Sequence, residues 1–404
     1  MSNFNTIDNI EVNGKVVMLR ADLNVPMDEN FKVTNTARID RTVPSIKELM
    51  DKGAKVVVAS HFGRPEEKGD PKCTLSHIVK DLEAAISGGV KVTFVEDCIG
   101  EKVEAAIANM GRNEVILLEN LRYYKEEKKG DLEFAKKLVA NCDIYVSDAF
   151  STAHRAHASM VAAASLKPNA AGRLMQTEVE ALTDGLSAPV RPVAAVVGGA
   201  KVSTKLELLT NLVKKVDVLV ISGGMAHTFL KAQGVDTVNE DNSLVQMDML
   251  DTAKEIMTTA KSAGCEIILP ADVVVSKEFK ANTESKSVDL DSIPASGWEL
   301  LDVGQKSIDA ISSKLESCKT LIWNGPLGVF ELVPFDKATN AVAQKAAELT
   351  EAGKLKTVAG GGDTVSAMVN AGVDKRFSYI STAGGAFLEW MEGKELPGVK
   401  ALEK

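Results

Sequence analysis

The sequence predicts an α/β protein made of two doubly wound, parallel-sheet (Rossmann-like) domains, joined by a helix, with a hinge cleft between them. Short apolar runs alternate with stretches of helical period along the whole chain, which is typical of β-α units with right-handed crossovers. With 404 residues, 45% of them hydrophobic, the chain is too long for one ordinary core. The runs in the first half end on charged or titratable residues and those in the second half on glycines, so we expect two domains with different ligands.

The strands predicted in the first half are apolar runs of the kind that forms buried parallel strands. They lie at 16–20, 56–60, 92–95, 115–118 and 144–147. The helix-like stretches between them lie at 41–52, 75–86, 101–109 and 132–140.

The second half repeats this alternation. Its predicted strands lie at 193–197, 218–221, 266–269, 320–323, 356–359 and 377–380. Its predicted helices lie at 204–214, 243–263, 304–316, 336–352 and 364–370.

The domain boundary is expected near 170–190. Residues 176–182 have the pattern of a connecting helix, and the proline-containing stretch 187–192 separates it from the next strand. The predicted organisation is a first domain at 1–175, a linker at 176–188, a second domain at 189–387 and a turn-rich tail at 388–404 that packs back on the first domain.

Composition excludes several classes of protein. The net charge of −9 argues for a soluble protein and against a nucleic-acid-binding surface. Five widely spaced cysteines without a C-x-x-C pair fit reduced thiols in a cytoplasmic protein better than a disulfide framework or a zinc site. No signal peptide is recognisable at the start and no apolar run approaches membrane length, so we expect no membrane association.

The arginines are unevenly distributed. Eight of the ten precede residue 175, and only Arg191 and Arg376 follow it. Because guanidinium groups bind carboxylate and phosphate in a bidentate way, the first domain is expected to hold a small, strongly anionic ligand. The alternative is a chance distribution of surface arginines.

Three first-half motifs follow predicted strands. In Arg20-Ala21-Asp22-Leu23-Asn24-Val25-Pro26 the alternate polar residues share one side of an extended segment, although an ordinary strand exit with turn-forming Asp and Asn explains them too. His61-Phe62-Gly63-Arg64 places imidazole and guanidinium at a strand end, where a binding role is favoured over a structural one. His154 and His157 permit metal binding, but no zincin pattern accompanies them, which favours anion binding.

The second-half motifs are glycine turns. Gly198-Gly199-Ala200-Lys201 continues to Lys205, and such a turn opening a helix binds phosphate through free N–H groups. It is neither a Walker A nor a G-x-G-x-x-G sequence. Gly360-Gly361-Gly362-Asp363 is a second such turn, in which Asp363 either caps a helix or holds Mg²⁺ on nucleotide phosphates. Residues 323–331 form either a ribose-binding loop, with Glu331 as acceptor, or a packed aromatic turn.

Taken together, the motifs resemble one family, the phosphoglycerate kinases, and the resemblance runs essentially from end to end. The matching segments are R-A-D-L-N-V-P at 20–26, H-F-G-R-P at 61–65, E-N-L-R at 119–122, D-A-F at 148–150, H-R-A-H-A-S at 154–159, G-G-A-K-V-S-T-K at 198–205, W-N-G-P-L-G-V-F-E at 323–331, G-G-G-D-T at 360–364 and E-G-K-E-L-P-G at 392–398.

The resemblance implies reversible phosphoryl transfer between 1,3-bisphosphoglycerate and ADP, giving 3-phosphoglycerate and Mg·ATP in glycolysis, by a cytoplasmic monomer whose domains close over both ligands. The implied glycerate-binding residues are Asp22, Leu23, Asn24, Arg38, His61, Phe62, Gly63, Arg64, Arg122 and Arg155. The implied nucleotide-binding residues are Lys201, Lys205, Gly223, Gly224, Asn324, Pro326, Glu331, Gly360, Gly361, Gly362, Asp363 and Thr364, with Asp363 serving Mg²⁺. The implied catalytic residues are Arg38, Lys205, Gly361 and Gly384.

Two departures from the family pattern stand near the end of the chain. Where the family usually reads H-[IV]-S-T-G-G-G, this sequence has Tyr379-Ile380-Ser381-Thr382-Ala383-Gly384-Gly385. Ala383 lacks the freedom of glycine at positive φ, so the flexibility of this loop is in question. Tyr379 replaces an imidazole that the family uses near its domain junction.

Phosphoryl transfer asks a protein mainly for alignment and charge neutralisation. Arg38 and Lys205 are expected to contact the transferring oxygens, and no general base is needed because the acceptor oxygen is already deprotonated. Two other classes remain as rivals. A non-catalytic two-domain binding protein is disfavoured by the glycine-lysine turn with Asp363, and a nicotinamide dehydrogenase by the lack of a dinucleotide fingerprint.

Overall fold

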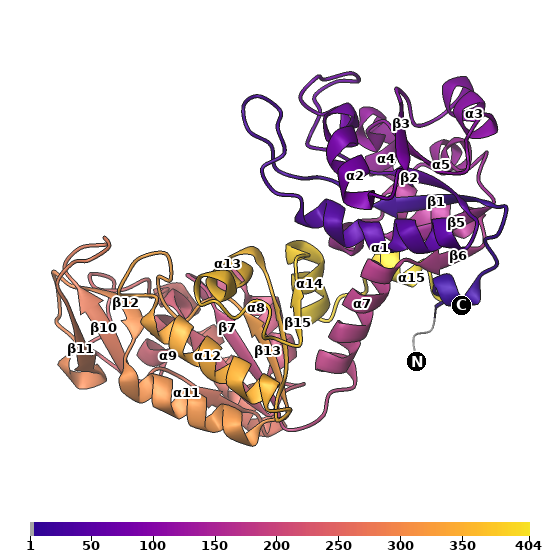
Figure 1. Ribbon diagram of the computed structural model, residues 1–404. Helices are drawn as coiled ribbons and strands as arrows, with labels where there is room; N and C mark the ends of the chain where they lie inside the picture. The colour runs from indigo at the N-terminus through magenta and orange to yellow at the C-terminus, as the bar shows by residue number, and fades with distance from the viewer. Residues whose placement is uncertain (1–3) are drawn as a thin grey trace. The chain divides into compact units, whose positions relative to one another are not determined.

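The computed structural model describes residues 4–404, which form two compact units (Figure 1). Among these residues, one unit comprises 4–180 with Glu395–Lys404, and the other comprises Ala181–Lys394. The division therefore falls within the helix α7 (Arg173–Leu182), whereas the sequence placed the start of the linker at 176. The predicted tail at 388 likewise begins inside the helix α14 (Gly384–Met391), and the chain passes to the first unit only after Lys394.

The first unit is built on a six-stranded parallel sheet with the order β3-β4-β2-β1-β5-β6. Its strands are β1 (Val16–Ala21), β2 (Lys55–Ala59), β3 (Lys91–Val95), β4 (Glu114–Leu118), β5 (Ile144–Asp148) and β6 (Asn169–Ala171). The central strands are buried almost throughout, as their apolar sequences predict. The chain leaves β1 first towards β2 and later towards β5, so the topological switch point of this sheet lies between β1 and β5.

Helices cover this sheet. They are α1 (Ala37–Asp51), α2 (Val79–Ile86), α3 (Glu101–Ala108), α4 (Lys125–Lys129), α5 (Leu132–Leu138), α6 (Ala163–Leu166), α7 and the terminal α15 (Pro397–Lys400). α1 and α2 pack side by side, and their Ile46, Leu49 and Leu82 side chains join the core formed with β1, β2 and β4. α1 begins four residues before the predicted start at 41, and β6, α4 and α6 were not predicted.

The last residues of the chain belong to the first unit. The Gly398 N–H donates to the Ala153 carbonyl at 2.8 Å, and Phe4 pairs with Glu403 in an isolated antiparallel bridge. A Cβ on Gly398 would lie 3.0 Å from the Ala153 Cα, which explains why glycine is found at this close approach.

The second unit contains another six-stranded parallel sheet, with the order β15-β14-β13-β7-β8-β9. Its strands are β7 (Val193–Gly198), β8 (Val218–Ser222), β9 (Glu266–Ile268), β13 (Thr320–Asn324), β14 (Lys356–Gly360) and β15 (Tyr379–Ser381). Here the switch point lies between β7 and β13. The predicted doubly wound parallel sheet is thus confirmed in both units.

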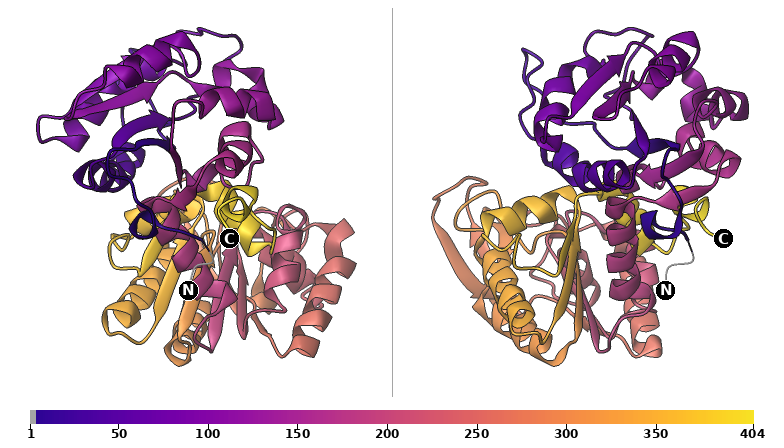
Figure 2. Two further views of the ribbon diagram at one scale, coloured as in Figure 1. Left: turned by 90° about the vertical axis from the view of Figure 1, so that its right-hand side faces the viewer. Right: turned by 45° about the vertical axis from the view of Figure 1, so that its right-hand side comes forward.

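Helices pack on both faces of the second sheet (Figure 2). They are α8 (Leu206–Leu212), α9 (Gly224–Ala232), α10 (Leu250–Ala263), α11 (Gln305–Ser317), α12 (Lys337–Glu351), α13 (Gly362–Asn370) and α14. One core joins α11, α12 and α13 to the strands around the fully buried Trp323. None of the helices in residues 4–404 is both long and apolar enough to span a bilayer.

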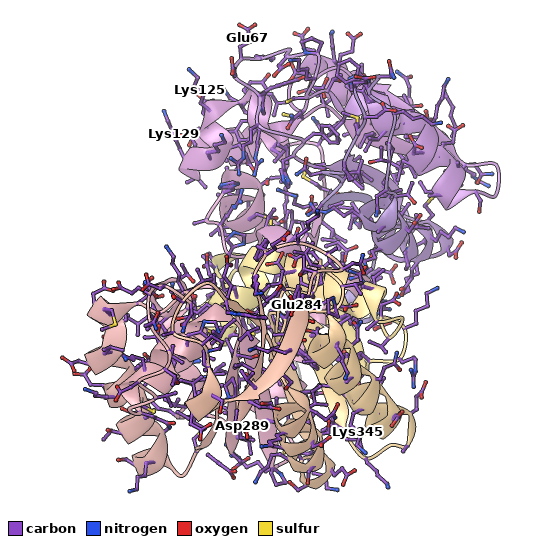
Figure 3. The ribbon with its side chains drawn as sticks, turned by 90° about the vertical axis from the view of Figure 1, so that its left-hand side faces the viewer. Glu67, Lys125, Lys129, Glu284, Asp289 and Lys345 are labelled. Atoms are coloured by element: carbon purple, nitrogen blue, oxygen red, sulfur yellow. The ribbon has the colours of Figure 1, made fainter. Side chains whose placement is uncertain are left out.

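A three-stranded antiparallel sheet, which was not predicted, lies beside this parallel sheet. It is formed by β10 (Asp272–Ser276), β11 (Ser285–Asp289) and β12 (Glu299–Val303), with β10 in the centre. In Figure 3, Asp289 marks the end of the strand β11, and Glu284 is the residue directly before its start. No residue of β11 is buried, so this edge strand is held by backbone pairing and has no hydrophobic pattern that sequence reasoning could detect.

Candidate active site

The carboxyl edge of the first sheet carries most of the anion-binding residues that the sequence indicated. β4, β2, β1 and β5 are neighbours, so the loops that follow them meet at one edge. These loops carry Asp22, Asn24, His61, Arg64, Arg122 and Arg155. Arg38, the second residue of α1, joins them through its contact with Asp22.

Asp22 is the central carboxylate of this edge and is only 5% exposed. Its Oδ2 accepts a hydrogen bond of 2.6 Å from Arg38 Nη1 and another from the Ser151 hydroxyl, and its Oδ1 accepts one from the Asn24 N–H at 3.1 Å. Burial raises the pKa of Asp22, but His61, Arg38 and these hydrogen bonds together outweigh burial and hold the pKa below its usual value. The ionised Asp22 thus fixes one end of a guanidinium whose side chain remains 37% exposed.

His61 is buried at the same edge and is neutral at neutral pH. Its Nδ1 lies 3.5 Å from Arg20 Nη2, and its Nε2 lies 4.0 Å from Asp22 Oδ1. Burial lowers the pKa of His61 well below its usual value; Asp22 opposes this effect, and the charges of Arg20 and Arg122 add to it. His61 therefore contributes hydrogen bonds to this edge and no charge of its own.

Arg122 adds a positive charge that few carboxylates balance. Its Nη1 donates to the Gly63 carbonyl at 2.7 Å, and the Gly63 N–H donates to Asn24 Oδ1 at 2.8 Å. Its Nε is buried and has no partner within residues 4–404. Burial, followed by repulsion from Arg155 and Arg20, lowers the pKa of Arg122 to about 10. An unpaired guanidinium nitrogen among crowded arginines fits a small polyanion.

Leu23, Phe62 and Gly63 shape these loops through their backbone. Leu23 and Phe62 are almost fully buried in the apolar core. Their N–H groups donate to the side chains of Ser60 and Asn120 at 2.9 and 3.0 Å. The side chains of Leu23 and Phe62 therefore point into the core. They hold the loops in place, and the polar residues next to them in sequence lie at the sheet edge.

The remaining cationic candidates are more exposed. Arg64 is exposed, and Arg155 donates its Nε–H to His154 Nε2 at 3.2 Å. His157 Nδ1 lies 3.8 Å from Glu127 Oε1, and burial lowers the pKa of His157 to about 4. In the described part of the chain no three or more His, Cys, Asp or Glu residues are arranged to hold a metal ion, which gives no support to a metal site at the two histidines.

Sequence reasoning missed the buried acid that supports this edge. Glu127 is fully buried, whereas Lys125 and Lys129 on the same short helix point outward (Figure 3). The Glu127 carboxylate accepts hydrogen bonds from the Ser159 hydroxyl at 2.6 Å and N–H at 2.9 Å, and Ser159 Oγ accepts from Arg20 Nε at 2.9 Å. The surrounding Lys-Glu-Glu-Lys-Lys sequence has the pattern of a solvated face, so no signal distinguished Glu127.

In the second unit, a cavity of about 740 Å³ lies where β7, β8, β13 and β12 end. The glycine turn 198–200 forms part of its wall, and a Cβ on Gly223, which has a φ of +68°, would lie 2.8 Å from the Gly199 carbonyl oxygen. The predicted nucleotide-binding residues that line it are Lys205, Gly223, Gly224, Pro326, Glu331 and Asp363. Its volume is within the range of small-molecule sites.

Lys205 is held at the end of the central strands. Its Nζ donates to the Gly198 carbonyl at 2.5 Å and to Asn324 Oδ1 at 2.6 Å. Burial lowers the pKa of Lys205 to about 8, against the opposing effect of Asp363. Lys201 instead has an exposed side chain outside the cavity wall, and a 3₁₀ turn at Val202–Thr204 separates it from α8.

Several predicted residues lie behind the cavity wall and support it. Asn324 Nδ2 donates to the Gly360 carbonyl at 2.8 Å, and Thr364 Oγ1 accepts from the Gly325 N–H at 2.7 Å. Gly361 has a φ of +100°, and a Cβ there would lie 2.7 Å from Asn324 Nδ2. Glycine is thus required both by the backbone conformation and by the close approach of Asn324.

Asp363 lies in the first turn of α13, directly after Gly362, and both residues are exposed. Within residues 4–404 its carboxylate forms no hydrogen bond, so the structure gives no support to the capping alternative. An exposed carboxylate at the cavity fits Mg²⁺, which is usually held by one or two carboxylates together with substrate phosphates. Glu331 is also exposed at the cavity.

The strand β12 forms part of the cavity wall. Its residues Glu299 to Val303 all line the cavity. His227 on α9 and the loop 240–244 were not predicted to do so. α9 is buried on nearly all sides and so lacks the periodicity that identifies a surface helix.

Replacing Asp302 with asparagine is expected to flatten the pH dependence of stability. Asp302 Oδ2 accepts from the Ala338 N–H at 3.0 Å, and burial raises the pKa of Asp302 from 3.8 to about 8. Between these values the native state keeps a proton that the unfolded chain loses, so wild-type stability falls as pH rises. Asp302→Asn keeps the acceptor and has no such proton, and its Tm should exceed that of the wild type by about 4 °C at pH 8.

Thermal unfolding between pH 4 and pH 8 provides the measurement, with the exposed Asp251→Asn as control. The control should follow the wild-type curve. If the curves of Asp302→Asn and the wild type ran parallel over the whole range, Asp302 would not carry the native-state proton.

Comparison with known proteins identifies the family. The family model described as phosphoglycerate kinase matches residues 7–394. The chain belongs to the phosphoglycerate kinase family. The phosphoglycerate kinase of Methylorubrum extorquens (strain PA1) is 57% identical over 403 residues, which cover 100% of this chain and 99% of the relative. That of Ruegeria sp. (strain TM1040) is 56% identical over 398 residues, covering 98% and 99%.

Solved phosphoglycerate kinase structures share the fold. The enzyme from Coxiella burnetii superposes with a TM-score of 0.89 at 38% identity, covering 99% of this chain and 98% of that one. The enzyme from Pyrococcus horikoshii OT3 superposes with a TM-score of 0.80 at 30% identity, covering 98% of both chains.

One departure from the phosphoglycerate kinase pattern carries no backbone strain. Ala383 precedes α14 with a φ of −93° and a ψ of 74°, outside the left-handed region that favours glycine. Its N–H donates to Ser381 Oγ at 3.1 Å, and Gly384 follows as the first residue of α14. Alanine is therefore compatible with this loop conformation. Tyr379, the other departure, is the half-buried first residue of β15.

Proposed function

We propose that this chain catalyses reversible phosphoryl transfer from 1,3-bisphosphoglycerate to ADP, giving 3-phosphoglycerate and ATP. The observation that carries the proposal is the pairing of two unlike sites in a chain of this family. One unit has a guanidinium-lined edge, and the other has a glycine- and lysine-lined cavity large enough for a nucleotide. We further propose that the protein acts in the cytoplasm as a monomer.

The glycerate ligand is assigned to the edge around Asp22. Arg38, Arg64, Arg122 and Arg155 would bind its phosphate and carboxylate oxygens, because they are the guanidinium groups of this edge with exposed or unpartnered nitrogens. Six further residues are assigned to its remaining polar atoms, which they bind directly or serve by shaping the loops. These residues are Asp22, Leu23, Asn24, His61, Phe62 and Gly63.

The nucleotide is assigned to the cavity of the second unit. The residues assigned to its wall are Lys205, Gly223, Gly224, Pro326, Glu331 and Asp363, and those assigned to its support or margin are Lys201, Asn324, Gly360, Gly361, Gly362 and Thr364. Asp363 would hold the Mg²⁺ that accompanies the nucleotide phosphates, and that ion would supply neutralising charge.

Phosphoryl transfer requires these residues to supply positive charge and to align the reacting groups. Arg38 and Lys205 would bind the oxygens of the transferring group in an in-line transfer, and the backbone of Gly361 and Gly384 would donate N–H groups where α13 and α14 begin. The acceptor oxygen is ionised at neutral pH, so no side chain has to remove a proton.

A coupled assay of ATP formation tests the function. The purified chain is mixed with ADP, 1,3-bisphosphoglycerate and magnesium, and ATP is detected by a second enzyme. Rapid ATP formation that is abolished by a chelator is expected. Absence of ATP above the uncatalysed background would overturn the proposal.

Transfer between ligands on two units also requires that the units close over them and exclude water, because an acyl phosphate hydrolyses readily. We expect the radius of gyration from small-angle X-ray scattering to decrease when 3-phosphoglycerate and a nucleotide are added together. Each ligand alone serves as the control and should have a smaller effect. An unchanged radius with both ligands bound would contradict hinge closure.

A further inference from the structure

We propose that His227 is a specificity-determining residue of the nucleotide site, whose imidazole hydrogen-bonds the edge of the purine base. This inference rests on the proposed function, because it takes the cavity of the second unit to be the nucleotide site. The family motifs quoted above do not include this residue.

His227 lies between the two chemically different parts of the cavity. Gly224, His227 and Leu230 are spaced three residues apart on α9 and so follow one face of the helix. Gly224 lies in the glycine- and lysine-lined part of the cavity wall. Leu230 packs in one cluster with Val273 and Leu300, which line the apolar part. An apolar wall suits the faces of a base, and His227 is the polar group that α9 presents next to it.

The imidazole is buried, and one of its two nitrogens has no hydrogen-bond partner in the described part of the chain. His227 is only 7% exposed, it lines the cavity, and its Nδ1 has no partner within residues 4–404. A buried polar atom without a hydrogen-bond partner destabilises the protein. A ligand that supplies the missing partner removes this cost. Rotation of the ring by half a turn exchanges Nδ1 with Cδ2 and Nε2 with Cε1, so the ring has two orientations that place its nitrogens differently.

Burial lowers the pKa of His227 to about 4, so the ring is neutral at neutral pH. A neutral imidazole has one nitrogen that donates and one that accepts. Because no group in residues 4–404 hydrogen-bonds Nδ1 and so fixes the tautomer, the ring can accept from the exocyclic amine of adenine or donate to the carbonyl oxygen that guanine carries at the same position. We therefore expect the site to use ADP and GDP with kcat/KM values within about tenfold of each other.

The test compares His227→Phe, which keeps a flat ring and removes both nitrogens, with His227→Asn, which keeps one donor and one acceptor. His227→Phe should raise the KM for ADP and for GDP about tenfold at unchanged kcat, as expected for a contact made equally in the ground and transition states. His227→Asn should recover most of this loss. A purely structural role of His227 would produce neither a raised KM at unchanged kcat nor the recovery of KM in His227→Asn.

Calorimetric titration separates contact with the base from contact with the phosphates. His227→Phe should weaken binding of ADP and GDP about tenfold and leave binding of inorganic tripolyphosphate unchanged. Equal ADP affinity of wild type and His227→Phe would overturn the inference, as would an equal loss for tripolyphosphate. If His227→Phe does not fold, His227→Leu takes its place with the same expectations. A wild-type chain that forms no ATP would instead overturn the proposed function, which keeps the two failures distinct.

Discussion

Arg38→Ala is expected to lower kcat about a thousandfold while changing the KM for 3-phosphoglycerate by less than about fivefold. The Nη1 of Arg38 donates a hydrogen bond of 2.6 Å to Asp22, and the Arg38 side chain remains 37% exposed. This geometry presents a guanidinium whose orientation is already fixed. If its contact with the transferring group strengthens in the transition state, removing it reduces turnover much more than ground-state binding.

Two further variants are compared with Arg38→Ala. Arg112→Ala removes an exposed arginine outside the site and should leave kcat and KM unchanged. Arg38→Lys keeps a charge but loses the planar guanidinium, so an intermediate kcat is expected. Because loss of Arg38 leaves the buried Asp22 without its charged partner, thermal unfolding must show that Arg38→Ala is folded at the assay temperature. A folded Arg38→Ala variant with kcat within threefold of wild type would exclude Arg38 from transition-state stabilisation.

Lys205→Met is expected to lower kcat by a similar factor of about a thousand. Its Nζ is held by the Gly198 carbonyl and Asn324 at the polar end of the nucleotide cavity, so the ammonium is positioned before any ligand binds. Methionine fills nearly the same space and removes only the charge and the donors. Lys214→Met, at an exposed lysine beyond the end of α8, is the matched control and should retain wild-type activity.

The same lysine predicts an alkaline limit of activity. Burial lowers the pKa of Lys205 to about 8 in the ligand-free protein, so the charged form is present below this pH and is lost as pH rises through it. The value of kcat/KM, which reports the free enzyme, should therefore fall above about pH 8. Lys205→Arg keeps its charge over the whole pH range. The kcat/KM that this variant retains should therefore not fall above about pH 8. A wild-type kcat/KM that stays constant up to pH 10 would contradict the charge role of Lys205.

The local chemistry of the strand ends could be predicted well from the sequence. Runs such as 115–118 and 193–197 form buried parallel strands, because a strand buried on both faces leaves little choice but apolar residues. The residues that follow them lie at the carboxyl edges, as the parallel arrangement requires. Elements without a hydrophobic pattern were missed, above all the exposed edge strand β11 and the nearly fully buried helix α9.

The amino-acid sequence by itself determined the fold class, the family and the residue types gathered at each sheet edge, since all three depend on residue type and spacing along the chain. Only the tertiary structure decided which of these side chains reach a cavity or a surface edge. It turned Lys205 inward and Lys201 outward, and it buried Glu127 and His227. The direction and burial of a side chain are set by packing between segments far apart in the chain, and residue spacing within one segment does not contain that information.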